Sequence, residues 1–170
     1  MNPISVEQLM QDFPLDYLRE LSTLGAISDD TVMNLLNEGR ILQLAEGETL
    51  YHFGEKVKGF YVILSGEIDL YQNHLGSEVL IHQYQTGEQI GFVGMIALHD
   101  RMGSAIASSN TVVLELSAYQ YFDLHLTASQ DFGLLTLNLS REMARTIGNL
   151  GNCVAELRAE NERLSAQEHH

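Results

Sequence analysis

Histidine is the residue type best suited to bind a metal or to move a proton near neutral pH. Apart from the last two residues, this chain has five histidines: His52, His74, His82, His99 and His125. Two closely spaced histidines with a carboxylate form one common set of metal ligands. No His-x-His or His-Glu pair occurs at ligand spacing, so we interpret these histidines as surface or strand residues and expect no metal site.

No other arrangement typical of catalysis is present in the sequence. There is no Ser–His–Asp signature and no phosphate-binding glycine loop that ends in lysine, and the carboxylates are scattered. We therefore expect that the protein is not an enzyme and that it has no cofactor.

The charge of the chain narrows the partners that it can have. It has 170 residues, of which 23 are acidic and 9 are basic, for a net charge of -14. Such a surface repels nucleic-acid phosphates and anionic lipids, so we expect no direct nucleic-acid binding and no membrane association. The N-terminus lacks signal-peptide features, no apolar run is long enough to span a membrane, and Cys153 is the only cysteine. A cytoplasmic protein is the prediction.

The first 38 residues have the apolar spacing of short helices. A weak helical pattern covers residues 4–12, and Pro14 precedes leucines at spacing three up to a predicted stop at Gly25. Ser28 is a good N-cap, and Gly39 is expected to end the helix that it begins.

From Arg40 the apolar period changes to two, which is typical of strands. Strands are predicted at 41–44, 60–64, 68–71, 79–84 and 111–116, with a hairpin turn at 73–76. Turn signals every 8–12 residues or so favour a sandwich or barrel. A metalloenzyme of the cupin type also has a β-roll, but the histidine spacing argues against it.

Glycines occur within or at the ends of three short segments, at 50–55, 59–68 and 86–91. Their order and spacing resemble the cyclic nucleotide-binding domain family, of the Crp/Fnr-like kind. The resemblance implies a mainly β fold with flanking helices: a double-stranded β-helix, or jelly-roll-like β-roll, followed by a long C-terminal dimerisation helix. It divides the chain into N-terminal helices at 1–38, the β-roll at 39–127, the C-terminal helix at 128–167 and a probable tag remnant at 168–170.

The resemblance also implies a ligand site. In the family a Gly-Glu pair opens a short helix that holds the phosphate, the Glu binds the ribose and a following Arg neutralises the phosphate. Matching positions give these candidate ligand-binding residues: Gly91, Phe92, Val93, Gly94, Arg101, Gly103, Ser104 and Ala105. Phe92 stands where the Glu is expected and is interpreted as filling the ligand cavity. Gly103 stands where the Arg is expected, and Arg101 would reach the site only if its loop rearranged.

The two replacements are expected to weaken binding of cyclic AMP (cAMP) or cyclic GMP (cGMP). A hydrogen bond to a charged group contributes about 1.5–3 kcal/mol, so the loss of two costs on the order of 3–6 kcal/mol. That change turns a micromolar site into a millimolar or weaker one.

The C-terminal helix has the apolar heptad pattern of a coiled coil. Predicted dimerisation residues are Ile147, Leu150, Val154, Leu157, Asn161 and Leu164. β-branched residues at one core position, leucine at the other and one polar Asn favour a parallel dimer. The alternative is that the stripe packs on its own β-roll, which we expect for Met143 and Ile147.

These observations predict a cytoplasmic signal-input domain. It would sense cAMP, cGMP or another small ligand and signal through the helix of a homodimer. The alternative is a ligand-free relative that serves as a dimerisation or protein-interaction module. A Crp/Fnr-type transcription factor would add a basic helix-turn-helix, but nothing basic follows Leu164, so a fragment of a longer protein or a different output domain fits equally well.

Overall fold

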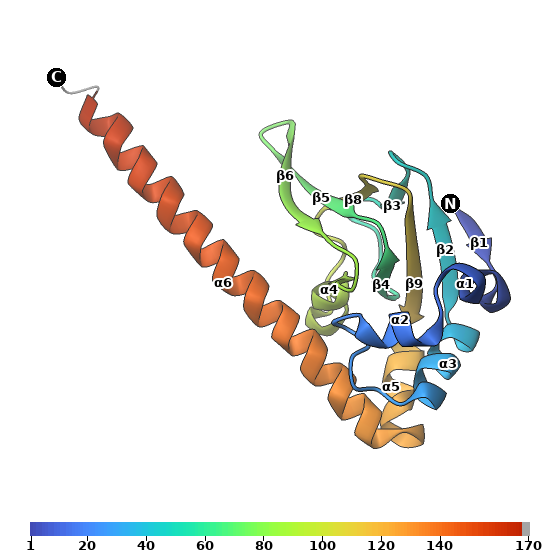
Figure 1. Ribbon diagram of the computed structural model, residues 1–170. Coiled ribbons are helices and arrows are strands. Elements are labelled where there is room, and N and C mark those ends of the chain that lie inside the picture. The colour runs from blue at the N-terminus through green and yellow to red at the C-terminus, as the bar shows by residue number, and fades with distance from the viewer. Residues whose placement is uncertain (168–170) are drawn as a thin grey trace.

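Two β-sheets, a group of helices and one long helix that leaves the body make up the molecule (Figure 1). The computed structural model describes residues 1–167, and the predicted tag remnant lies outside the described residues. In chain order the elements are β1 (Asn2–Ile4), α1 (Val6–Asp12), α2 (Leu15–Glu20), α3 (Asp29–Glu38), β2 (Arg40–Leu44), β3 (Thr49–Tyr51), β4 (Gly59–Ser65), β5 (Ile68–His74), β6 (Ser77–Tyr84), β7 (Gln89–Ile90), α4 (Phe92–Ala97), β8 (Ser104–Ala107), β9 (Thr111–Ser117), α5 (Ala118–Thr127) and α6 (Ser129–Gln167).

The strands pair antiparallel in two sheets. One sheet has the order β1-β2-β9-β4-β7 and the other has the order β3-β8-β5-β6. Strands that follow one another in the sequence are therefore often not neighbours in a sheet, as expected for a β-roll. The predicted fold class is confirmed. The predicted turn between β5 and β6 is also confirmed, with Leu75 and Gly76 in the left-handed conformation.

Two apolar cores lie on the two faces of the five-stranded sheet. The inner core lies within the roll and includes Leu44, Ile63 and Val113 of that sheet with Ile68 and Ala105 of the other. The outer core packs the opposite face of the same sheet against the helices. Strand β4 contributes to both cores, which explains why its apolar run is almost continuous rather than alternating.

The N-terminal segment differs from its prediction at two places. Residues Asn2–Ile4 pair with β2 as a strand, and the helix begins only after Ser5, which caps it. Helix α2 ends at Glu20, so the prediction of a helix up to Gly25 is wrong. The chain leaves the helix because the Thr23 backbone N–H donates to the Gly87 carbonyl, a tertiary partner that leucine spacing cannot reveal.

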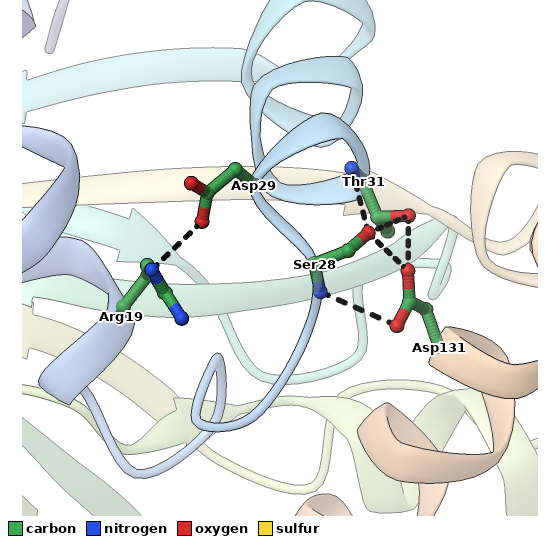
Figure 2. A network of polar contacts seen from close by, with 5 residues as sticks. All are labelled: Arg19, Ser28, Asp29, Thr31 and Asp131. Carbon is green, nitrogen blue, oxygen red and sulfur yellow. Dashed lines mark hydrogen bonds and ion pairs between the residues drawn. The ribbon is translucent and has the colours of Figure 1, made fainter.

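Helix α6 starts against the beginning of α3 (Figure 2). The Asp131 carboxylate accepts hydrogen bonds from the hydroxyls of Ser28 and Thr31 and from the Ser28 backbone N–H. Ser28 also caps α3 as predicted. An exposed ion pair joins Arg19 and Asp29 beside this network, at 3.1 Å.

The first part of α6 belongs to the outer core, and its later part does not. Leu135 and Leu139 are fully buried, and Met143 packs partly buried against the same core. The C-terminal part of the helix extends away from the sheets (Figure 1). Met143 therefore packs on the body as expected, whereas the same expectation for Ile147 is wrong, since its side chain is 70% exposed.

Candidate functional site

A cavity of about 290 Å³ is lined by residues from both sheets, helix α4, the loop that follows α4 and helix α6. Its apolar lining comes from Leu70, Ile81, Val93, Met102 and Leu150. Its polar lining comes from Tyr51, Gln72, Tyr84, Gln89, His99, Asp100 and Arg101, and three glycines complete it. Because Leu150 belongs to α6, the long helix forms part of the cavity wall.

Gly91 makes the turn from β7 into α4. Its φ of 93° lies in the left-handed region that glycine adopts freely and other residues adopt at a cost. No side chain at Gly91 caps the helix; instead the Gln89 side-chain oxygen accepts the Phe92 backbone N–H at 3.1 Å. Gln89 itself lines the cavity, so one polar residue links the cavity to the first turn of α4.

Arg101 is the buried positive charge of the site. Its side chain is only 7% exposed, and its guanidinium donates to the carbonyl oxygens of Gly59 at 3.0 Å and Gly91 at 3.3 Å. The guanidinium carbon also lies 4.2 Å from the centre of the Tyr51 ring. The prediction that the loop would have to rearrange is therefore wrong: the guanidinium already lies against Gly91.

The charges around the cavity leave Arg101 without a carboxylate partner. Among residues 1–167, no carboxylate forms a salt bridge with it, and the Asp100 carboxylate in the lining pairs with Lys56 at 2.9 Å. Burial raises the pKa of the Tyr51 hydroxyl, against the influence of Arg101, and raises the pKa of Tyr61 to about 12. Both tyrosines are thus neutral at pH 7, and Arg101 gives the wall a positive charge that favours an anionic group.

Phe92 lies in the outer core and is not among the residues that line the cavity. Its side chain is buried, with edge-to-face contacts to Phe60 at 5.2 Å and Tyr121 at 5.4 Å between ring centres. The interpretation that Phe92 fills the ligand cavity is therefore wrong. The ring packs beneath helix α4 and joins it to β4 and α5.

Gly103 lines the cavity directly before β8, where the chain comes close to β5. A Cβ added there would lie 2.5 Å from the Tyr71 carbonyl oxygen. A larger residue, including the arginine expected from the family, would therefore require β5 to move. The basic residue of this site is Arg101, and a side chain at position 103 is excluded by the approach of the two strands.

The structure brings together five of the eight predicted site residues and separates three. Gly91, Val93, Gly94, Arg101 and Gly103 line the cavity. Ser104 and Ala105 belong to β8, where the Ser104 hydroxyl oxygen accepts the Phe53 backbone N–H and Ala105 is buried in the inner core.

Sequence reasoning did not find the contributions of Tyr51, Tyr84 and Gln89 to the cavity, and it assigned Leu150 to the dimer seam alone. For Gln89 a signal was available in the sequence, because this polar residue directly precedes the apolar Ile90 and the turn glycine Gly91. Leu150 has no comparable signal, because its place in a heptad says nothing about a cavity formed by distant strands.

Beyond the cavity, α6 presents an exposed apolar stripe. We call Ile147, Leu150, Val154, Leu157 and Leu164 the α6 stripe; each has a large exposed fraction, for example 65% for Leu157. Asn161 lies on the same helix and is exposed as well. In the described part of the single chain the stripe is largely exposed, and only Leu150 also lines the cavity.

Neither a metal site nor a membrane span was found in the part of the chain that the structure describes. No group of three His, Cys, Asp or Glu side chains among residues 1–167 is placed to hold a metal ion. Over the same residues, no helix has the length and hydropathy needed to cross a bilayer.

A model of the Cyclic nucleotide-binding domain family matches residues 41–127, which is just over half of the chain. The chain belongs to the cyclic nucleotide-binding domain family. The match begins in β2 and ends with α5, and it includes every cavity-lining residue except Leu150.

Solved structures support the same fold. The Catabolite Activator Protein of Thermus thermophilus aligns with a TM-score of 0.67 at 22% identity, over 81% of this chain and 63% of that chain. A cyclic nucleotide-binding domain of Methylobacillus flagellatus gives 0.69 at 18% identity, over 87% and 86%. The global regulator CLP of Xanthomonas campestris, described as c-di-GMP responsive, gives 0.70 at 15% identity, over 77% and 65%.

One curated protein, Lysophospholipase NTE1 of Pyricularia oryzae, is 22% identical over 141 residues. The match covers 82% of this chain but only 9% of that protein. The chain thus spans a small fraction of this relative and somewhat less than two thirds of the Thermus protein, so the similarity concerns one domain of each.

Proposed function

We propose that this chain is a regulatory domain that binds a small anionic ligand in the cavity and passes the response to a second copy through α6. The observation that carries the proposal is that Leu150 of α6 lines the same cavity as Gly91 and Arg101. A ligand that contacts both the roll and the helix can favour one position of the helix over another. It shifts that equilibrium by the difference between its affinities for the two positions.

The family makes cAMP and cGMP the first ligands to consider. Arg101 supplies a positive charge beside Gly91, although from a different position than the family's arginine. The family's glutamate position holds a phenylalanine, Phe92, whose side chain lies in the core. We expect weaker binding of either nucleotide than an intact family site would give, and we add cyclic di-GMP because the Xanthomonas relative is described as responsive to it.

The proposed dimer rests on the α6 stripe and on the residues between its members. Exposed apolar residues at alternating spacings of three and four, with Asn161 in register, are typical of a two-stranded coiled coil. A monomer would leave Ile147, Val154, Leu157 and Leu164 largely in water. We therefore propose a homodimer with two parallel α6 helices.

Calorimetric titration with cAMP, cGMP and cyclic di-GMP tests the ligand part of the proposal. Val93→Trp should abolish any binding, because Val93 is half exposed and lines the cavity. Ile96→Trp is the matched control, since Ile96 is similarly exposed on the same helix but does not line the cavity. Equal loss in both variants would place the ligand elsewhere.

Analytical ultracentrifugation tests the dimer separately. Leu157→Asp places a charge in the α6 stripe and should give a monomer at tens of micromolar. Ala159→Asp places the same charge on the opposite side of the helical repeat and should leave the dimer intact. A monomeric unmutated chain would contradict the zipper.

A second candidate function is supported by the state of Arg101. Its guanidinium already donates to two carbonyl oxygens and lies over an aromatic ring. The buried charge of Arg101 therefore does not need an anionic ligand to be stabilised. In this alternative the chain is a ligand-free dimerisation module. It predicts no binding heat for any of the three nucleotides up to millimolar concentration, together with an intact dimer.

A further inference from the structure

Glu142 is a buried carboxylate on α6 that faces the body of the protein. Its side chain is 5% exposed, and it forms no salt bridge with a lysine or arginine in residues 1–167. One oxygen accepts the hydroxyls of Ser22 at 2.9 Å and Thr23 at 2.7 Å. The other oxygen accepts the Gln89 backbone N–H at 3.0 Å.

A continuous set of hydrogen bonds connects this carboxylate with the cavity. Gln89 donates its backbone N–H to Glu142, and its side-chain oxygen accepts the backbone N–H of Phe92, the first residue of α4. Gln89 also lines the cavity, beside Gly91. A single residue therefore separates the buried carboxylate of α6 from both the cavity and the start of α4.

We propose that Glu142 is the positioning residue that couples the cavity to helix α6. A change at Gly91 or at the first turn of α4 moves the Gln89 N–H, and Glu142 is the only α6 side chain that it reaches among the described hydrogen bonds. This proposal rests on the proposed function of the cavity as a ligand site. It adds the route by which an occupied cavity acts on the helix.

The surroundings of Glu142 offer two discrete arrangements, as a coupling element requires. The hydroxyl oxygens of Ser22 and Thr23 each lie within hydrogen-bond distance of both Glu142 and the Gly87 carbonyl oxygen, at 2.7 to 2.9 Å. Each hydroxyl has one hydrogen, so it donates either to the helix or to the turn that leads into β7. When Gln89 withdraws its N–H, the hydroxyls remain as donors to the carboxylate; when the carboxylate withdraws, they turn to Gly87.

Asn138 provides the control residue that separates coupling from simple attachment. It is also buried on α6, and its side-chain amide donates to the carbonyls of Thr23 and Gly25. It thus ties α6 to the same N-terminal segment, but among residues 1–167 its side chain forms no hydrogen bond with β7 or α4. A residue that only holds the helix in place should behave like Asn138.

Hydrogen exchange of the full chain, measured by mass spectrometry, tests the proposal without a known ligand. Val93→Trp fills the cavity, and we expect it to change exchange in residues 136–146 of α6, which exclude the cavity-lining Leu150, by about fivefold or more, the lower end of usual coupling. In a Glu142→Leu background this change should fall below about twofold, whereas an Asn138→Leu background should keep it. Glu142→Leu leaves Ser22 and Thr23 with Gly87 as an acceptor, and Glu142→Gln, which keeps one acceptor oxygen, should restore part of the response.

An equal response of α6 in the Glu142→Leu and Asn138→Leu backgrounds would overturn the coupling role, and so would no response to Val93→Trp in the unmutated background. Calorimetry with cAMP on the same proteins separates this result from the proposed function. No cAMP binding together with a Glu142-dependent response refutes cAMP as the ligand and supports the coupling. If cAMP binds, but the exchange response of α6 to Val93→Trp is as large in the Glu142→Leu background as in the unmutated background, the coupling alone is refuted.

Discussion

A methyl group at Gly91 should displace the guanidinium of Arg101, and the cost can be worked out from the structure. The Cβ of an alanine at this position would overlap the Arg101 Nη1 atom. Arg101 cannot move freely, because it is buried, bonded to the carbonyls of Gly59 and Gly91 and stacked on Tyr51. Gly91→Ala therefore probes the contact on which the charge of the cavity depends.

Two terms contribute to the expected loss. A non-glycine residue in the left-handed region costs roughly 1–2 kcal/mol. Displacement of the guanidinium removes at least one hydrogen bond from a charged donor, which costs a further 1.5–3 kcal/mol or so. The free energy of unfolding should thus fall by about 2.5–5 kcal/mol in total.

Gly47→Ala supplies the matched control for the backbone term. Gly47 has a φ of 83°, close to that of Gly91, but an added Cβ would meet nothing within 4 Å. Its substitution should cost only the first 1–2 kcal/mol or so. Urea unfolding followed by far-ultraviolet circular dichroism measures both values, provided that the m-value is unchanged.

The reasoning is refuted if Gly91→Ala and Gly47→Ala cost the same. A double-mutant cycle gives a second check, because in an Arg101→Ala background the methyl group has nothing to displace. The cost of Gly91→Ala should then fall to that of Gly47→Ala. Additive effects of the two substitutions would mean that the guanidinium does not lie against Gly91.

Three further predictions concern the core and two carboxylates of α6, Glu142 and Asp131. Phe92→Ala should lower the free energy of unfolding by about 3–5 kcal/mol, because it empties an aromatic core position, and should leave calorimetric binding to the cavity less affected than Val93→Trp. Burial raises the pKa of Glu142 above its ordinary 4.5, and the nearby charge of Glu88 acts in the same direction. Tyr84 also interacts electrostatically with Glu142. The Glu142 carboxyl therefore binds a proton more tightly in the folded state than in the unfolded state. The stability that this group contributes is fully present at pH values below its ordinary pKa and is lost as pH rises through the raised pKa of the folded state. In Glu142→Gln, the urea midpoint should no longer decrease over this pH range. Burial acts to raise the pKa of Asp131, but hydrogen bonds from Ser28 and Thr31 outweigh it and lower the pKa, so its stability contribution is present at neutral pH and is lost on acidification. Asp131→Asn should cost about 1 kcal/mol at pH 7 and progressively less in acid, and an equal cost at both pH values would contradict this account.

The strands and the long helix were predicted well because their signals are local. Apolar residues alternate with polar ones at the start of β5, form short runs in β2 and β9 and follow a helical period in α6, and the structure has these elements at those places. The cap Ser28 and the turn at Leu75–Gly76 follow from the chemistry of single residues. Such signals need no knowledge of distant contacts.

The cavity was predicted only in outline. Gly91 was assigned to the site from its match to the family motif, and the structure places it in the cavity lining, in a left-handed turn that favours glycine. Phe92 was assigned to the cavity by its position in the chain, yet Phe60 and Tyr121 draw its ring into the outer core. The direction of a side chain at the start of a six-residue helix depends on which face the rest of the fold covers.

By itself the sequence determined the β-roll, the order of its elements and the absence of a glutamate and an arginine at the two expected positions. Only the tertiary structure decided that Arg101 supplies the positive charge, that Leu150 of α6 closes the cavity and that Glu142 bonds to Gln89. Each of these facts joins residues that are far apart in the chain or that reach the site from an unexpected backbone position. Periodicity and spacing describe which face of an element is apolar, whereas the meeting of a buried charge with its partners is fixed only when separate elements pack together.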